Sequence, residues 1–214
     1  MGSSILRNAA KTLCFHKTRS LLNLLVGLSL LIFASSSWAC SDSDIRFSSS
    51  SHRIYIENGA TCSLSQIDSI VANKYSSVAP GELLEQTSSG VWLLKTEIRI
   101  EDGSQLNLHG TAIGGDVNTF YMLSRNGFDE YHVKIQAKHG TVDMRSVNVS
   151  SWDPNSNGPD TNLDNGRAFI HVNSVEVGGV AKESTMNIID SEVSYLGFYD
   201  AESYGLVWKV RGGD

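Results

Sequence analysis

The chain has 214 residues, a formal net charge of −6 and a hydrophobic content of 41%. Without the N-terminal segment described next, about 175 residues remain, which is enough for one domain with a sizeable core. The acidic balance, and the lack of a basic stripe with interleaved aromatic residues, argue against nucleic acid as a partner. An acidic surface does not attract an anionic polymer by itself, so such a ligand would require a local cluster of Arg and Lys.

The first 39 residues have the parts of a secretory signal peptide. Residues 1–19 carry four basic side chains and no acidic one, and residues 21–33 form an apolar run. That run is shorter than the roughly 20 apolar residues that span a bilayer. Small Ser37 and Ala39 occupy the two positions that a signal peptidase reads. We predict cleavage after Ala39, export to the periplasm or the cell exterior, and no stable membrane span in the mature chain.

An uncleaved membrane anchor and a lipoprotein are the alternatives to this prediction. The lipoprotein would use Cys40, which directly follows the predicted cut, but Ser37 stands where such signals usually have an aliphatic residue. The mature chain keeps two cysteines, Cys40 and Cys62, which are expected to pair in an oxidising compartment. Closing that loop of about 22 residues contributes roughly 3 kcal/mol in the chain-entropy model.

Residues 40–80 are predicted to form an N-terminal leader and cap. The segment 41–51, rich in Ser and Asp, is expected to be exposed, and the alternation of 52–56 suits a strand. Residues 63–74 have a helical pattern that Ser63 or Ser65 can cap. The apolar residues on one face of this helix are Leu64, Ile67, Ile70 and Val71. Such a helix could cover the open end of a stack of strands, which would otherwise expose unpaired backbone groups.

Residues 81–214 are predicted to form an incomplete β-helix. Short runs with one buried face follow one another here, and no long helical pattern separates them, which argues against an α/β fold. The runs are 91–94, 98–100, 105–108, 120–123, 132–135, 141–144, 146–149, 168–172, 185–189, 191–196 and 205–208.

Three segments share one template: a small residue, a hydroxyl residue, and then an apolar–polar–apolar triplet. They begin at Gly103, Gly140 and Ser184, so they are 37 and 44 residues apart. We interpret each separation as about two 20-residue turns of a solenoid, whose inward side chains form ladders. The alternative is an antiparallel sandwich, whose strands are equally short. We favour the parallel β-helix because a sandwich does not require repeated side-chain identity.

Two polar stretches are candidates for function. In 151–167, the residues Asp153, Asn155, Asn157 and Asp164 have spacings that resemble a calcium-binding loop. The last ligand is Asp instead of Glu, and the same residue types also make an ordinary long turn. Calcium is the only cofactor that the sequence suggests, since no zinc spacing is present.

The second stretch, 195–205, mixes aromatic rings with carboxylates, which suits carbohydrate. Asp200 and Glu202 would share a face if they lay on a strand, and could then form an acid/base pair. The alternative is an aromatic ladder inside the stack with two solvated acids at a turn. The sequence shows no Ser–His–Asp order, phosphate loop or HExxH motif. The histidines His109, His132, His139 and His171 are scattered and are expected to be surface or ladder residues.

Residues 90–108, 151–170 and 191–208 together resemble the N-terminal half of secreted right-handed β-helix proteins similar to periplasmic mannuronan 5-epimerases. The motifs SWD…PDTN…GR and YLG…ESYGL carry this resemblance most specifically. It implies a right-handed parallel β-helix with a groove for a polysaccharide, such as a polyuronate. It also implies sugar contacts near Arg167, Asp200, Glu202 and Tyr204.

In that family a His is the base and an Arg neutralises the uronate carboxylate, and an Asp-Pro-His-Asp motif supplies part of the site. Here Asp153-Pro154 is followed by Asn155, so no catalytic residue can be assigned. The chain also ends soon after the resemblance does, without a cap for a solenoid. We therefore expect a truncated relative of a polysaccharide-modifying enzyme that is inactive alone. The alternatives are a non-enzymatic carbohydrate-binding or cell-surface β-helix, and a subunit whose open end a second chain completes.

Overall fold

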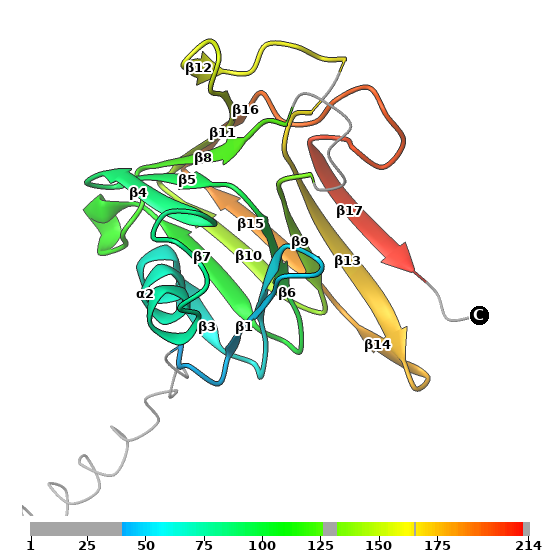
Figure 1. Ribbon diagram of the computed structural model, residues 1–214. Helices are drawn as coiled ribbons and strands as arrows, with labels where there is room; N and C mark the ends of the chain where they lie inside the picture. Colours follow the sequence, from blue (N-terminus) through cyan, green and yellow to red (C-terminus); the bar gives the residue numbers. More distant parts are fainter. Residues whose placement is uncertain (1–39, 126–131, 165, 212–214) are drawn as a thin grey trace, which may run out of the picture. The chain divides into compact units, whose positions relative to one another are not determined.

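The computed structural model describes residues 40–125, 132–164 and 166–211, so the predicted signal peptide lies outside the described residues. Its strands form three sheets (Figure 1). Sheet 1 contains β5 (Val91–Leu94), β8 (Thr119–Leu123), β11 (Asn148–Asp153) and β16 (Glu192–Ser194). Sheet 2 contains β2 (Arg53–Ile56), β6 (Glu97–Ile100), β9 (Lys134–Lys138), β13 (Phe169–Val177) and β17 (Leu206–Arg211). Sheet 3 contains β3 (Thr61–Ser63), β7 (Gln105–His109), β10 (Thr141–Arg145) and β15 (Thr185–Ile189).

The chain passes through these sheets in a fixed order. From β5 onward it visits sheet 1, sheet 2 and sheet 3, and then returns to sheet 1 one strand further along. All neighbouring strands named above pair in parallel. A sandwich of antiparallel sheets is therefore wrong for this chain, and the order of visits is that of a solenoid.

The three repeated segments of the sequence stack in register in sheet 3. Leu106 pairs with Val142, and Val142 pairs with Met186, at equivalent positions of β7, β10 and β15. The ladder of inward side chains is confirmed. The prediction that each separation spans two turns is wrong, because one turn separates each pair of repeats. A turn of this chain includes three strands and long loops, which lengthen it well beyond 20 residues.

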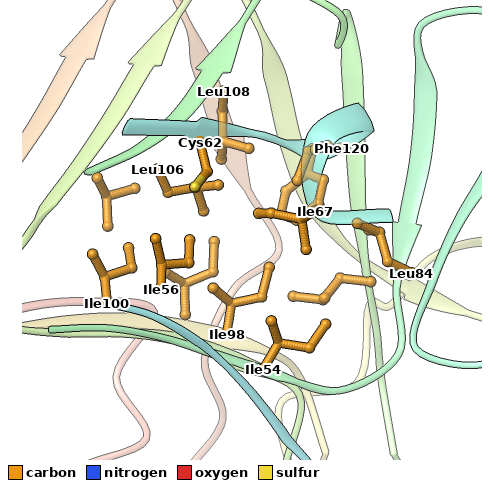
Figure 2. Close-up of a cluster of buried hydrophobic side chains, with 14 of the residues drawn as sticks. Ile54, Ile56, Cys62, Ile67, Leu84, Ile98, Ile100, Leu106, Leu108 and Phe120 are labelled. Atoms are coloured by element: carbon orange, nitrogen blue, oxygen red, sulfur yellow. The ribbon is translucent and has the colours of Figure 1, made fainter. Parts of the chain in front are cut away.

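The core lies between the three sheets and consists of aliphatic ladders (Figure 2). In sheet 2, Ile54, Ile98, Ile135 and Ile170 occupy equivalent positions of successive strands, and all four are fully buried. Burying a side chain of this size stabilises the fold by about 1.5–3 kcal/mol relative to leaving it exposed. Side chains that alternate with these isoleucines point away from the core, which gives sheet 2 a separate outer face.

The N-terminal elements pack on the first turn. Helix α2 (Leu64–Lys74) begins after Ser63, whose hydroxyl and the Gln66 side chain form a reciprocal capping box. The predicted apolar face is confirmed, since Leu64, Ile67, Ile70 and Val71 are all buried. β1 (Ile45–Ser48) pairs antiparallel with β2, and β4 (Leu84–Ser88) pairs antiparallel with β5.

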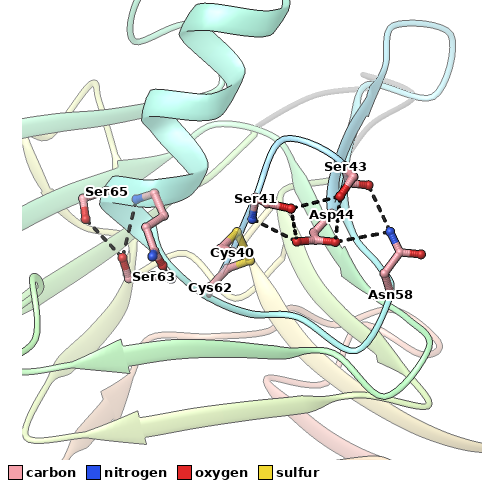
Figure 3. The surroundings of a disulfide bond; sticks show 9 residues. Cys40, Ser41, Ser43, Asp44, Asn58, Cys62, Ser63 and Ser65 are labelled. Atoms are coloured by element: carbon pink, nitrogen blue, oxygen red, sulfur yellow. Dashed lines mark hydrogen bonds between the residues drawn. A yellow bond between two sulfur atoms is a disulfide. The ribbon is translucent and has the colours of Figure 1, made fainter. Parts of the chain in front are cut away.

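The expectation that 41–51 is an exposed leader is wrong for part of that segment. Ile45 begins β1 and is fully buried, and Asp44 is also buried. Asp44 accepts hydrogen bonds from the backbone N–H of Ser41 and from the side chain of Asn58 (Figure 3). Pairing with β2 supplies the buried partner that the sequence of this short segment does not reveal.

Cys40 and Cys62 form the predicted disulfide (Figure 3). Their Cα atoms are 4.9 Å apart, and 22 residues separate them in sequence. Cys62 is fully buried in β3, so the bond ties the start of the described chain to sheet 3.

Three short elements complete the fold: the 3₁₀ helix η1 (Thr111–Ile113), β12 (Gly158–Pro159) and β14 (Val180–Lys182). Within the described ranges, the helices are too short or too polar to cross a membrane.

Candidate functional site

Long loops gather at one corner of the solenoid, where the chain passes from sheet 1 to sheet 2. In successive turns the described residues at this corner are 124–125 with 132–133, 154–164 with 166–168, and 195–205. Both polar stretches that the sequence analysis selected therefore lie at the same corner. Backbone hydrogen bonds join them, because Gly197 N–H donates to the Ala168 carbonyl and Tyr199 N–H donates to the Leu163 carbonyl, both at 2.8 Å.

The loop 195–205 surrounds an open pocket of about 660 Å³, which we call the corner pocket. Its described lining residues are Leu163, Leu196, Gly197, Phe198, Tyr199, Asp200, Ala201, Tyr204 and Gly205. Most of these side chains are aromatic or aliphatic. The volume is within the range of about 300–1,000 Å³ that is usual for small-ligand sites.

Two of the four predicted sugar-contact residues, Asp200 and Tyr204, line the corner pocket. Glu202 does not line it; its carboxylate pairs with Lys209 and lies 3.8 Å from Arg211. The assumption that Asp200 and Glu202 share a face of a strand is wrong. Both residues lie in a turn, where the Asp200 carbonyl accepts the N–H of Ser203 and Glu202 has a φ of 63°.

Arg167, the fourth predicted contact residue, is buried at the same corner. Its guanidinium carbon lies 5.9 Å from the centre of the Tyr195 ring, and its Nε has no hydrogen-bond partner within the described residues. A buried guanidinium with an unused donor can bind an anionic or hydroxyl group that reaches it.

The outer face of sheet 2 is rich in basic side chains, and we call it the basic face. Its basic members are Arg46 from β1, Arg53, Arg99, Lys134, Lys138, Lys209 and Arg211. The acidic residues that pair with them or stand in the same rows are Glu57, Glu97, Glu101 and Glu202. Basic groups thus outnumber acidic ones on this face of an acidic protein.

One buried carboxylate organises the centre of the basic face. Glu97 is 5% exposed, and its two oxygens lie 2.8 Å from Arg53, 3.0 Å from Arg99 and 3.5 Å from Lys134. The amide oxygen of Gln136 accepts a further bond from Arg99 at 2.6 Å. Three cations around one carboxylate leave an excess of positive charge at fixed positions.

Arginines also surround the ring of Tyr55. The guanidinium carbon of Arg46 lies 3.6 Å from the ring centre, and those of Arg53 and Arg99 lie at 5.5 and 5.9 Å. Burial raises the pKa of the Tyr55 hydroxyl, but hydrogen bonds with Arg53 and Ser51 outweigh burial and lower the pKa overall. Stacking on a ring holds arginines in place while their remaining N–H groups stay available.

Two histidines and two phenylalanines form a cluster where the basic face meets the corner. The ring centres of His132 and Phe198 are 5.2 Å apart, and those of Phe169 and His171 are 4.7 Å apart. His132 also lies 6.2 Å from Phe169, so the four rings are continuous. The Lys134 ammonium lies 5.7 Å from the centre of the Phe169 ring.

Burial lowers the pKa of both histidines below the usual 6.5, and the charge of Lys134 lowers each pKa further. Asp200 opposes this shift at His132, and Glu202 opposes it at His171. His171 is 8% exposed, and its Nε2 has no hydrogen-bond partner among the described residues. At neutral pH both imidazoles are uncharged, so in each ring one nitrogen is a hydrogen-bond donor and the other an acceptor.

Sequence reasoning missed the basic face and treated His132 and His171 as scattered. Arg53, Arg99 and Lys134 are tens of residues apart, so no local motif connects them. A signal does exist, because an outward position precedes each buried isoleucine of the sheet 2 ladder. Aligning the turns on Ile54, Ile98 and Ile135 would have placed the three cations and Glu97 in neighbouring rows.

The predicted calcium ligands lie in two separate parts of the 154–168 loop and its flanks. β11 and β12 form a hairpin, in which Asp153 pairs with Gly158 and the Asp153 carboxylate accepts the N–H of Asn155 at 2.9 Å. Asn157 lies in the same hairpin with a φ of 51°, whereas Asp164 lies beyond it and is exposed. Within the described part of the chain, His, Cys, Asp and Glu side chains form no group that could hold a metal ion. Calcium binding by the set that includes asparagines stays a prediction.

Of the comparisons with known proteins, the one with solved structures found matches. No family model matches the chain, and no curated protein matches it. The chain is similar in structure to the periplasmic alginate epimerase AlgG, at 17% sequence identity and a TM-score of 0.49. A double mutant of AlgG gives 16% identity and the same TM-score. The alignments cover 72% of this chain and 30% of the epimerase, so the chain spans less than a third of the length of the proteins that it matches.

Proposed function

We propose that this protein binds an anionic polysaccharide along the basic face of sheet 2. The observation that carries the proposal is the row of cations held by Glu97, which ends at the cluster of His132, Phe169, His171 and Phe198. The cations supply charge for carboxylate groups, and the rings supply surface for the apolar faces of sugars. An acidic protein needs a local cluster of Arg and Lys to bind an anionic polymer, and the basic face contains such a cluster.

The shape of the basic face favours a polymer over a single sugar. Neighbouring strands are about 4.8 Å apart, so the five strands of sheet 2 span roughly 19 Å along the stack. The cations are distributed over this length and are not focused on one point. A chain of uronate residues that runs along the stack would meet a cation at several successive sugars, and such contacts add avidity.

We further propose that the stack is a right-handed parallel β-helix and that the protein is exported. A crossover connection between two parallel strands of one sheet is right-handed in about 98% of cases. The Cys40–Cys62 disulfide supports an oxidising compartment, such as the periplasm. The proposed ligand would then be a polysaccharide of the cell envelope or its surroundings.

Binding is tested by titrating the purified mature chain with polymannuronate and, as a neutral control, with a β-1,4-glucan of similar length. We expect binding of the polyuronate only, with an affinity that falls as salt increases. Lys134→Gln combined with Lys138→Gln should weaken this binding. The matched control is Arg145→Gln, because Arg145 lies in β10 of sheet 3, outside the basic face. Equal binding of both polymers, or binding that salt does not change, would refute the proposal.

Catalysis is a second candidate function, which His171 favours. Its uncharged imidazole lies on a face suited to uronates and has a buried Nε2 that finds no hydrogen-bond partner among the described residues. The imidazole is also flanked by the charges of Lys134 and Lys209. A base in this position could remove a proton from the carbon next to a carboxylate. The family motif Asp-Pro-His-Asp is absent from the 214 residues, so we propose a relative of the polysaccharide-modifying enzymes that binds polymer without epimerising it.

Proton exchange separates these two functions. Polymannuronate is incubated with the protein in heavy water and followed by NMR at C-5. We expect no deuterium at C-5 and no guluronate signals, while binding persists. Incorporation of deuterium that His171→Gln abolishes would show that the chain is itself catalytic.

A further inference from the structure

We propose that the protein binds two kinds of sugar at two places, uronate residues on the basic face and a neutral hexose in the corner pocket. The ligand would then be a heteropolysaccharide that contains both kinds of unit, instead of a homopolymer of uronate. This inference rests on the proposed function and specifies its ligand.

The corner pocket is lined in part by apolar side chains that are exposed and do not belong to the core. Tyr199 is 92% exposed, Tyr204 is 65% exposed and Leu163 is 62% exposed, and all three line the same cavity. Single exposed apolar residues are ordinary, but a group of them around a concave site marks a binding surface. A pocket of about 660 Å³ with aromatic walls has room for a sugar ring and presents flat apolar surface to it.

Charge decides which sugar the corner pocket can take. Asp200 is the charged residue among its described lining residues, and no basic side chain lines it there. A carboxylate accepts hydrogen bonds from the hydroxyls of a neutral sugar, but it repels the carboxylate of a uronate. Lys209, in the strand β17 that follows this loop, is already paired with Glu202. The pocket therefore disfavours the residues that the basic face attracts.

Backbone hydrogen bonds hold the corner pocket in shape. Tyr199 N–H donates to Leu163, Phe198 N–H donates to Ser203, and Gly197 forms a bridge with Tyr204. Gly197 has a φ of 77°, and a Cβ there would lie 2.2 Å from the backbone nitrogen of Gly205, so the loop closes more tightly than any other residue would allow. A wall that is already ordered loses little conformational entropy when a ligand binds.

The corner pocket and the basic face are connected, so one ligand can occupy both. Phe198 lines the pocket, and the centre of its ring lies 5.2 Å from that of His132, which in turn adjoins Phe169 at the edge of the basic face. The charge of Asp200, which lines the pocket, also raises the pKa of His132. A polysaccharide that crosses the junction would change from acidic to neutral units there.

The test compares three oligosaccharides of equal length by calorimetry. These are a homo-oligomer of mannuronate, a neutral cello-oligosaccharide, and an oligomer in which glucuronate and glucose alternate. We expect the mixed oligomer to bind roughly tenfold more tightly than the homo-oligomer, the size of effect expected for stacking on two rings. Tyr199→Ala combined with Tyr204→Ala should remove this preference and leave the affinity for the homo-oligomer unchanged.

The control variant is Trp208→Ala, which removes a similarly exposed aromatic residue outside the corner pocket. It should keep the preference for the mixed oligomer. Saturation-transfer NMR on the ligand provides a second readout, in which protons of glucose, and not of glucuronate, receive signal from the tyrosines. Equal affinities for mixed and homo-oligomers, unchanged in the tyrosine variant, would overturn this inference alone. If neither acidic oligomer bound to the folded protein, the proposed function itself would fail.

Discussion

The guanidinium of Arg53 lies 2.8 Å from the carboxylate of Glu97, on the neighbouring strand of sheet 2. The same carboxylate contacts Arg99 and Lys134 and is 5% exposed. Glu97→Gln would leave these partly buried cations without their shared counter-ion. We expect a loss of about 3 kcal/mol in the free energy of unfolding, measured by urea denaturation.

Glu57→Gln is the matched control for this variant. It removes a carboxylate that also pairs with an arginine, but Arg46 is 46% exposed in that pair. Solvent screens such pairs, and the expected loss is below about 1 kcal/mol. Equal losses in the two variants would mean that the Glu97 network has no special role.

The carboxylate of Asp143 should make stability depend on pH. Burial alone would raise the pKa of Asp143, but hydrogen bonds from His109, Arg145 and Asn187 outweigh it and lower the pKa. A lowered pKa means that the unfolded state binds the proton more readily. This contribution is complete above the pKa of the unfolded chain and is lost as the pH falls through the folded pKa.

Thermal unfolding at a series of pH values checks this prediction. Asp143→Asn should lower the stability at neutral pH and flatten its decrease in acid. A variant that keeps the full acid dependence would show that other groups cause it.

The Cys40–Cys62 disulfide should contribute about 3 kcal/mol to stability, because it restricts a loop of 22 residues in the unfolded chain. The measurement compares urea denaturation of the oxidised protein with that of the double variant Cys40→Ala, Cys62→Ala. Thiol labelling of the unfolded protein serves as the control for oxidation. If the wild-type protein has two free thiols after export, the bond does not form and the prediction is wrong.

Gly197→Ala should damage the corner pocket. The left-handed backbone alone costs about 1–2 kcal/mol for a residue with a Cβ. The added methyl would also meet the backbone of Gly205 at 2.2 Å, so the loop must shift. Gly179→Ala is the matched control, because its φ of 76° is similar but its Cβ would meet no atom within 4 Å. Only the Gly197 variant should lose binding of the mixed oligosaccharide.

The histidines should report on polymer binding. His132 and His171 should titrate below pH 6.5 in the free protein, because burial and Lys134 lower each pKa. An anionic polymer on the basic face would stabilise the charged imidazoles and raise both pKa values. NMR titration of the imidazole carbons with and without polymannuronate measures the change. In the Lys134→Gln, Lys138→Gln variant, which should bind the polymer weakly, the polymer should have little effect.

The repeats show which features of the fold can be predicted from local sequence. The template shared by the segments at Gly103, Gly140 and Ser184 predicted both the strands and their stacking, because equivalent side chains form the ladder of Leu106, Val142 and Met186. The number of residues in a turn could not be obtained this way. Loops such as 154–168 lengthen a turn without changing the ladder, so the spacing of repeats does not count turns.

The sequence by itself determined β2 and most strands from β5 onward, the capped helix 64–74, the pairing of Cys40 with Cys62 and the stretch 195–205 that forms the corner pocket. These features depend on residues that are near in sequence or on a short repeating pattern. The tertiary structure alone decided the basic face and the histidine cluster. Glu97, Lys134 and His171 come from three successive turns, and only the parallel stacking of those turns brings these side chains near one another.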